Sequence, residues 1–162
     1  MGEPYDVIIL GSGPAGLQAA IHAARKKASV MVLGRVRNSA LAKAHVENFC
    51  CMDGVAKGLE ILSRGRQQAQ NAGAGFLEED AMEAGPEGDG GFFVVTESGK
   101  RLSGRSLVLA MGVERKRLNV PGEKDYVGKG VSYCADCHGV LFAAQPVAVV
   151  GDGSAAASTC LT

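Results

Sequence analysis

The feature that most constrains this chain is a glycine-rich loop between a short apolar run and an alanine-rich helical segment. The apolar run at residues 7–10 is unbroken and rich in β-branched side chains, which is typical of a parallel strand covered on both faces. The loop Gly11-Ser12-Gly13-Pro14-Ala15-Gly16 follows it, and a helix is predicted over residues 17–27. A second apolar strand is expected at residues 29–33. Together these segments predict a βαβ unit.

The spacing of the glycines in this loop predicts a site for the pyrophosphate of a dinucleotide. In such a loop the glycines allow a tight turn, a close approach of the phosphates, and packing of the helix against the strand. The start of the following helix offers unpaired N–H groups and a partial positive charge. We therefore expect Gly11, Gly13 and Gly16 to meet the cofactor, together with Ser12, Pro14 and Ala15. The alternative is a glycine-rich turn that binds no ligand.

The residues after the second strand leave the identity of this nucleotide open. A carboxylate that binds the ribose is usual about 20 residues after the loop, but this chain has Gly34-Arg35-Val36-Arg37 there. Arg35 and Arg37 could meet a ribose 2′-phosphate, which would indicate NADP, or they could be solvated surface charges. We place Gly34 and Arg35 among the cofactor-binding residues. The residues by themselves do not separate FAD from NADP at this first site.

The composition argues against several other classes of protein. Lys+Arg and Asp+Glu both number 17, so no excess of positive charge indicates a nucleic acid or an anionic membrane as partner. We expect neither a signal peptide nor a membrane-spanning run, and therefore a cytoplasmic location. Five cysteines in that compartment favour chemistry or packing over a framework of structural disulfides.

The rest of the chain predicts further elements and a boundary near Pro121. We expect a loop over 35–48, a helix over 55–71, a strand over 75–77, a loop over 85–91, a hairpin of 92–96 with 100–102, and a buried strand over 106–110. A long polar connection follows over 111–129. A strand over 147–150 then leads into a second glycine-rich loop and another helix, so the order of strand, glycine loop and helix occurs twice.

Cys134 and Cys137 form a C-x-x-C motif. On a helix the two positions share one face, close enough for a reversible disulfide, and a first thiol at a helix start would be the attacking thiolate. Three other interpretations stay open. The pair could be half of a zinc site completed by His45, Cys50 or Cys51, a haem attachment of the form C-x-x-C-H, or plain buried cysteines.

Several motifs then stand in a fixed order along the chain. After the first glycine loop come Val46-Glu47-Asn48-Phe49, Ala110-Met111-Gly112, Val120-Pro121-Gly122-Glu123, the run from Gly130 to Cys137, and the run from Val147 to Ala156. Their order and spacing resemble the low-molecular-weight thioredoxin reductases, which are disulfide oxidoreductase flavoproteins with two dinucleotide domains.

The resemblance implies an α/β fold with two Rossmann-like parts. Residues 1–116 would form an FAD-binding domain of three layers, in which a parallel sheet carries a small β-meander. Residues 117–162 would begin an inserted NAD(P)H-binding domain that contains the C-x-x-C motif and is truncated. Because the family is about twice as long, we expect an N-terminal fragment that is inactive alone.

The resemblance also implies roles for individual residues. FAD would contact the first glycine loop, Asn48, Ala81 and the segment Ala110-Met111-Gly112, and NAD(P)H would contact Gly151, Gly153 and Ala156. Cys137 would lie beside the flavin, and Cys134 would exchange with the disulfide of a thioredoxin-like protein. The full-length enzyme would be a homodimer without a metal.

Two departures from the family pattern bear on these roles. The family's Gly-Gly-Gln stretch is replaced by Asn38-Ser39-Ala40, so a flavin contact is lost. The family's Asp after the second cysteine, a proton donor, is replaced by His138. A histidine can do this work near pH 7, but the change is equally consistent with a different partner. The alternative function is a non-catalytic nucleotide-binding or thiol redox-sensing module.

Overall fold

The computed structural model describes residues 3–161 except 48, 51, 89, 114 and 115, and it leaves out the side chain of Cys137. It divides into two compact units, Met1–Val113 and Glu114–Thr162. In the part of the chain that is described, no helix has the length and apolar character needed to cross a membrane.

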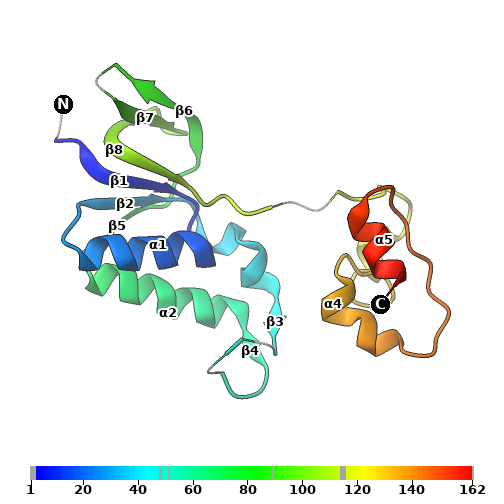
Figure 1. The fold of residues 1–162 in the computed structure, drawn as a ribbon. Helices are drawn as coiled ribbons and strands as arrows, with labels where there is room; N and C mark the ends of the chain where they lie inside the picture. Colours follow the sequence, from blue (N-terminus) through cyan, green and yellow to red (C-terminus); the bar gives the residue numbers. More distant parts are fainter. Residues whose placement is uncertain (1–2, 48, 51, 89, 114–115, 162) are drawn as a thin grey trace. The chain divides into compact units, whose positions relative to one another are not determined.

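The first unit is built on a six-stranded sheet with the strand order β5-β2-β1-β8-β7-β6. The strands are β1 (Tyr5–Leu10), β2 (Val30–Leu33), β5 (Gly75–Leu77), β6 (Ala81–Glu87), β7 (Gly91–Thr96) and β8 (Arg101–Leu109). Strands β5, β2, β1 and β8 pair in parallel, whereas β8, β7 and β6 pair antiparallel. The predicted βαβ unit is thus one part of a sheet that continues into a meander (Figure 1).

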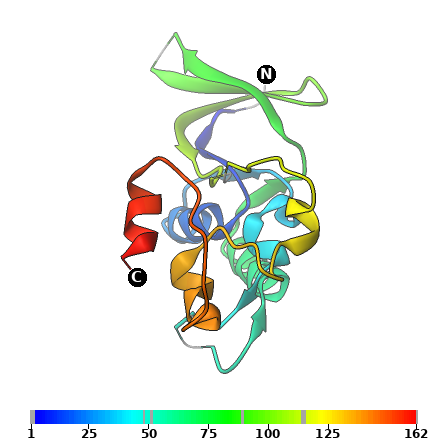
Figure 2. The ribbon, with the colours of Figure 1, turned by 90° about the vertical axis from the view of Figure 1, so that its right-hand side faces the viewer.

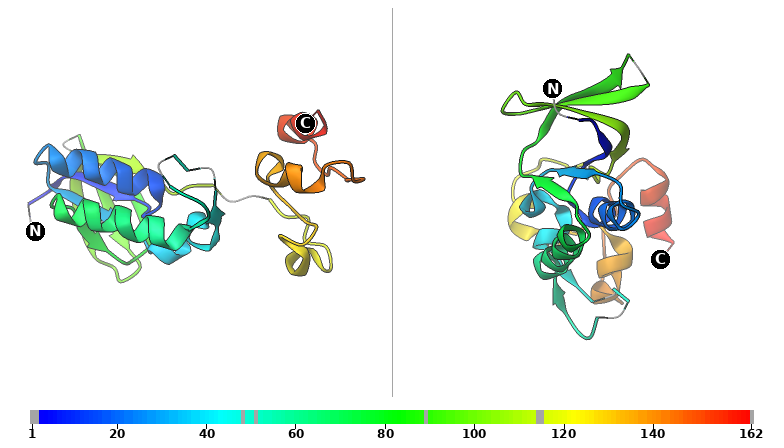
Figure 3. Two further views of the ribbon diagram at one scale, coloured as in Figure 1. Left: turned by 90° about the horizontal axis from the view of Figure 1, so that it is seen from below. Right: turned by 90° about the vertical axis from the view of Figure 1, so that its left-hand side faces the viewer.

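Two helices cover one face of the parallel strands. Helices α1 (Pro14–Arg25) and α2 (Gly58–Asn71) lie side by side on this face (Figures 1 and 3). Ala20 of α1 and Ala69 of α2 are fully buried against Ile9 of β1 and Val32 of β2. The small alanine side chains let both helix backbones come close to the sheet.

The opposite face of the parallel strands is covered by the meander. Ile8 and Leu33 alternate with the helix-facing residues along their strands and pack against Val94 of β7 and Leu102 of β8. Figure 2 shows the antiparallel strands extending away from the helices of this unit. The predicted three-layer α/β fold, with a Rossmann-like parallel sheet, is therefore confirmed.

A single strand, β8, takes the place of the two strands that were predicted over 100–102 and 106–110. Gly104 lies where β8 changes partners, because it pairs with Phe92 of β7 and also with Tyr5 of β1. A Cβ at Gly104 would lie 2.8 Å from Cγ1 of Ile8, so only glycine lets the backbone pass this closely. The prediction of two strands was wrong because an interior glycine resembles a break.

The loop predicted over 85–91 was wrong for a related reason. Strand β6 runs to Glu87 and β7 begins at Gly91. Pro86 lies within β6, and this is tolerated because β6 is at the edge of the sheet, where a missing N–H costs little.

The segment between β2 and α2 also differs from its prediction. It contains two short 3-10 helices, Val36–Asn38 and Ala40–Lys43, and a small antiparallel pair of β3 (His45–Val46) with β4 (Ala56–Lys57). Because residues 56–57 pair with β3, α2 begins at Gly58, three residues later than predicted.

The second unit consists of short helices joined by irregular segments. These are α3 (Glu123–Tyr126), α4 (Ala135–His138), a 3-10 helix (Gly139–Phe142) and α5 (Ser154–Cys160). The strand predicted over 147–150 is not formed, and Val147 and Val150 are both 65% exposed. A parallel strand needs a neighbour to satisfy its backbone groups, and the described residues of this unit offer none to this segment.

A buried carboxylate organises the first half of the second unit. Glu123 is 5% exposed and accepts hydrogen bonds from the N–H groups of Leu118 (3.1 Å) and Asn119 (2.6 Å) and from the Tyr133 hydroxyl. The Tyr133 hydroxyl is the main group that holds the pKa of Glu123 below its ordinary value, with these N–H groups acting in the same direction against the effect of burial. Through its bond with the hydroxyl, Glu123 fixes Tyr133, which directly precedes Cys134.

We expect Glu123→Gln to lower the local stability of the segment that Glu123 holds in the second unit, because a neutral amide is a weaker acceptor for three donors. The pKa of Glu123 is lowered in the folded state, so its contribution is present above the ordinary glutamate pKa and is lost as pH falls through the folded value. Amide hydrogen exchange at Leu118 and Asn119, followed as a function of pH, measures both effects. Asp125→Asn on the same helix is the control, and unchanged protection in Glu123→Gln would contradict this account.

Candidate functional site

The first glycine loop lies at the carboxyl ends of three parallel strands. The Gly11 N–H donates to the last carbonyl of β2 (2.8 Å), and the Ala110 N–H donates to the last carbonyl of β1 (2.8 Å). Gly34 has a φ of +124°, and a Cβ there would lie 3.4 Å from the backbone nitrogen of Ser12. The structure therefore brings Gly11, Ser12, Gly34 and Ala110 to one edge of the sheet, which is where such sheets bind ligands.

Two of the three motif glycines are required by the packing of the protein itself. A Cβ at Gly11, whose φ is +111°, would lie 2.2 Å from the carbonyl oxygen of Ala110. A Cβ at Gly16 would lie 1.9 Å from the carbonyl oxygen of Gly11. Both distances are far below van der Waals contact, so these glycines let β8, the loop and α1 pack together.

Gly13 is different, because no backbone atom of the protein blocks a Cβ there. Its φ of −79° and ψ of −175° are open to any residue, and the nearest atom to a Cβ would be Oγ of Ser39 at 3.3 Å. Gly13 is the N-cap of α1, which has Pro14 in its first turn, no acidic residue there and no side-chain cap. The space above Gly13 thus faces the positive end of a twelve-residue helix, a setting that suits a phosphate.

Ser39 is a residue of this site that the sequence did not reveal. Its hydroxyl lies beside the backbone of Gly13, although Asn38-Ser39-Ala40 was interpreted as the loss of a contact. A hydroxyl can donate a hydrogen bond to a phosphate oxygen. The position depends on the two consecutive 3-10 helices after β2, which were predicted as loop.

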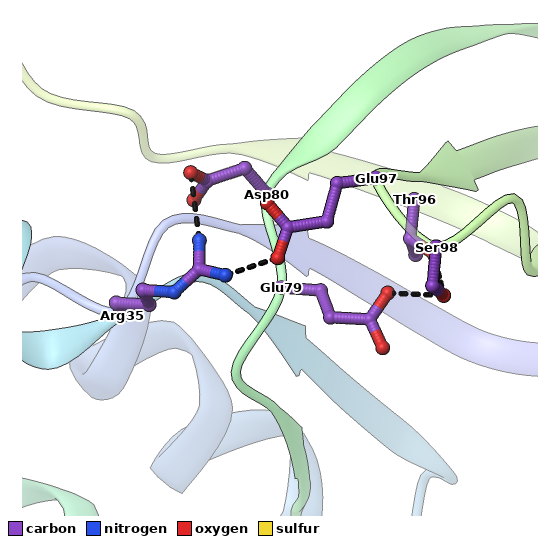
Figure 4. A network of polar contacts seen from close by, with 6 residues as sticks. All are labelled: Arg35, Glu79, Asp80, Thr96, Glu97 and Ser98. Carbon is purple, nitrogen blue, oxygen red and sulfur yellow. Dashed lines mark hydrogen bonds and ion pairs between the residues drawn. The ribbon is translucent and has the colours of Figure 1, made fainter.

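Arg35 is held by two carboxylates from distant parts of the chain (Figure 4). Its Nη1 lies 2.8 Å from Oδ2 of Asp80, and its Nη2 bonds Oε1 of Glu97. The hydrogen bond to Glu97 is the main cause of a raised pKa at Arg35. Next to this network the Ser98 hydroxyl donates to Glu79 (2.6 Å). Arg35 therefore joins the end of β2 to the start of β6 and the end of β7.

Two further predicted residues, Ala81 and Met111, line one small hollow of about 180 Å³ in the first unit. The wall is mainly apolar and consists of Leu10, Ala81, Met82, Glu83, Ala84, Leu109 and Met111. Gly112 follows with a φ of +73°. Asn48, predicted to lie near the flavin, is outside the described residues.

The cysteine motif lies in the second unit. Cys134 is disulfide-bonded and is the N-cap of α4, with an extended φ of −139°. The Ser132 hydroxyl oxygen accepts from the Cys134 N–H (3.1 Å) and lies 2.8 Å from Nδ1 of His138. The sequence patterns did not reveal Ser132 either.

The second glycine loop precedes a helix, as predicted. Gly153 is the N-cap of α5, and a Cβ at Gly151 would lie 2.9 Å from the Cβ of Ala156. Across the described residues, no three His, Cys, Asp or Glu side chains come together as a metal site.

Comparison with known proteins identifies the family of this chain. Residues 5–162 match the family described as pyridine nucleotide-disulphide oxidoreductase. The chain therefore belongs to that family.

Individual relatives are thioredoxin reductases. The chain is 37% identical over 150 residues to the thioredoxin reductase of Aquifex aeolicus (strain VF5). The aligned region covers 91% of this chain and 46% of that protein. It is 36% identical over 155 residues to the thioredoxin reductase of Bacillus subtilis (strain 168), covering 94% and 48%. The structure of thioredoxin reductase from Streptococcus pyogenes MGAS5005 matches with a TM-score of 0.84 and 31% identity, covering 97% and 51%. The chain spans about half the length of these relatives.

The glycine geometry predicts opposite effects of alanine at two motif positions. Gly16→Ala forces a Cβ against the Gly11 carbonyl and should destabilise the first unit by about 1–3 kcal/mol or more. Gly13→Ala should stay within about 1 kcal/mol of wild type, because its backbone is unstrained and its one tight neighbour, Oγ of Ser39 at 3.3 Å, is a small side-chain hydroxyl that can shift by a few tenths of an ångström. Chemical denaturation followed by circular dichroism measures both. Gly88→Ala, in the open turn after β6, is the control, and equal destabilisation by the two motif variants would refute the distinction.

Proposed function

We propose that the first unit binds FAD, with its pyrophosphate over Gly13. One observation carries the proposal: Gly13 is the motif glycine that the protein's own packing does not require. A glycine in an unstrained conformation beside a helix start is explained by a ligand that approaches the backbone closely. Ala15 and Gly16 would offer their N–H groups to the phosphates, and the Ser39 hydroxyl would add a donor.

The pairing of Arg35 favours FAD over NADP at this first site. A 2′-phosphate needs a cation whose donors are available, but the Arg35 guanidinium is bonded to Asp80 and Glu97. These two carboxylates would also repel a second phosphate near the ribose. FAD has no 2′-phosphate and avoids this conflict. Gly34, Ala81 and the segment Ala110-Met111-Gly112 lie at the same edge or hollow and would complete its binding site, with Asn48 as a further contact.

The chain would act in an enzyme that reduces a protein disulfide. Bound FAD would supply two-electron transfer between NAD(P)H and a disulfide. Gly151, Gly153 and Ala156 would begin the NAD(P)H site. The names of the relatives support a thioredoxin-like protein as the final acceptor.

We assign Cys137 as the disulfide partner of Cys134 on the basis of the C-x-x-C spacing. Reduction breaks the S–S bond and uses two electrons and two protons to form two thiols. His138, directly after Cys137, would donate one proton as a general acid and the solvent would supply the other. The Cys134 thiolate would then attack one sulfur of the partner's disulfide, so that the partner's S–S bond breaks, a mixed disulfide forms and the partner's second sulfur leaves as a thiolate.

The remaining assignments follow the same family pattern. We place the border between the FAD-binding part and the NAD(P)H-binding part at residues 116–117. We expect the complete enzyme to be a cytoplasmic homodimer.

The proposal predicts that Gly13→Ala loses FAD while it keeps its fold. The added methyl group would intrude on the phosphates, so FAD affinity should fall at least tenfold. Quenching of flavin fluorescence during titration of the chain measures the affinity, with Gly88→Ala as control. Full FAD affinity in Gly13→Ala would count against this placement. A wild-type chain that binds no flavin but binds another nucleotide tightly would instead favour a non-catalytic nucleotide-binding or thiol redox-sensing module.

The Arg35 network yields a separate prediction about nucleotide choice. In the double variant Asp80→Asn, Glu97→Gln the guanidinium no longer has charged partners, so affinity for NADP relative to NAD should rise several-fold. Competition of each nucleotide against FAD measures this ratio. Glu87→Gln removes a carboxylate of the same strand, β6, that pairs with Arg101 and lies outside both the network and the hollow, so it should leave the ratio unchanged. Preference for NADP over FAD in the wild-type chain would contradict the assignment of this site.

A further inference from the structure

The hydroxyl group of Ser132 makes three polar contacts beside the disulfide-bonded cysteine. Its oxygen accepts from the Cys134 N–H (3.1 Å), its hydrogen is directed to the Cys134 carbonyl (3.1 Å), and its oxygen lies 2.8 Å from Nδ1 of His138. The backbone N–H of His138 also donates to the Cys134 carbonyl (3.2 Å). Ser132, Cys134 and His138 are therefore tied together through both side-chain and backbone groups.

The single hydrogen of the Ser132 hydroxyl determines which ring nitrogen of neutral His138 carries a hydrogen. A serine hydroxyl has one hydrogen and two acceptor lone pairs. If that hydrogen goes to the Cys134 carbonyl, the short contact to His138 is satisfied only when Nδ1 carries a hydrogen and donates it to the hydroxyl oxygen. All three contacts are then hydrogen bonds. With the hydrogen on Nε2 instead, the hydroxyl must turn to Nδ1 and gives up the Cys134 carbonyl, so one bond is lost.

We propose that Ser132 is a positioning residue that holds His138 in the Nδ1–H form and leaves Nε2 as the atom that exchanges protons. The inference deepens the proposed function, since it rests on His138 as the acid of the disulfide site. The protonated ring would give the Nε2 proton to a thiolate, so that an N–H bond breaks, an S–H bond forms and a neutral Nδ1–H ring is left.

The anchoring of Ser132 links this proton to the cysteine. Both bonds that orient the hydroxyl go to the backbone of Cys134, so they do not depend on how the cysteine side chain is placed. The adjacent Tyr133 is fastened in turn to the buried Glu123. The ring is exposed, and its orientation therefore depends on Ser132 rather than on packing.

Nitrogen NMR of the 162-residue chain tests the inference directly. Long-range ¹⁵N–¹H correlations of ring-labelled histidine distinguish the two neutral forms, and His138→Gln assigns the signals against those of His22 and His45. We expect neutral His138 to be mainly Nδ1–H. In Ser132→Ala the ratio of Nδ1–H to Nε2–H should fall by a factor of about 2 to 10, as expected for one hydrogen bond of ordinary net strength.

Two further variants separate the proposed effect from general disturbance. Ser132→Thr keeps the hydroxyl and should therefore show the wild-type ratio of Nδ1–H to Nε2–H. Ser154→Ala in the same unit should also leave this ratio unchanged. A wild-type ring that is mainly Nε2–H or evenly mixed, or a ratio that Ser132→Ala leaves unchanged, would overturn the proposal. Because the measurement needs no flavin, failure of FAD binding would refute the proposed function and leave this result standing.

Discussion

The carbonyl oxygens of Ala110 and Gly11 occupy the space in which side chains at Gly11 and Gly16 would lie. This close contact holds the end of β8, the first glycine loop and α1 together at one edge of the sheet. Because packing requires glycine at positions 11 and 16, the start of α1, where Gly13 is the N-cap, is held in one place. The backbone at Gly13 is thereby left open toward a ligand, and the proposed cofactor site is a consequence of how tightly its two neighbours are packed.

The local part of this fold could be predicted from the sequence, and the non-local part could not. The βαβ unit depends on neighbouring residues with clear apolar patterns, and it was predicted within a few residues. Strand β8 depends on a change of partner at Gly104. From the sequence alone, a glycine at this position looks like the end of a strand. Strand β6 contains Pro86 and is possible only at an edge. The segment 147–150 has the composition of a strand, but composition does not supply the neighbour that a strand requires.

The functional residues divide in the same way. The glycines, Ala110 and the cysteine motif stand in recognisable patterns, whereas Asp80, Glu97 and Ser39 reach the site only through the fold. Asp80 and Glu97 make Arg35 a link between strands. In the proposed function these bonds leave Arg35 poorly suited to a 2′-phosphate. Ser132 lies close to His138 in the sequence, but its role depends on the direction of one hydroxyl bond, which no pattern of residue types specifies.

The central claim is that a dinucleotide without a 2′-phosphate lies over Gly13. Titration of ¹⁵N-labelled chain with FAD, with backbone amide shifts as the readout, tests it most directly. The account predicts that the largest shifts occur at Gly13, Ala15 and Gly16, with smaller shifts at Ser39, and that NADP at the same concentration produces weaker changes there. Shifts that spare Gly13 to Gly16, or an equal response to NADP, would contradict it.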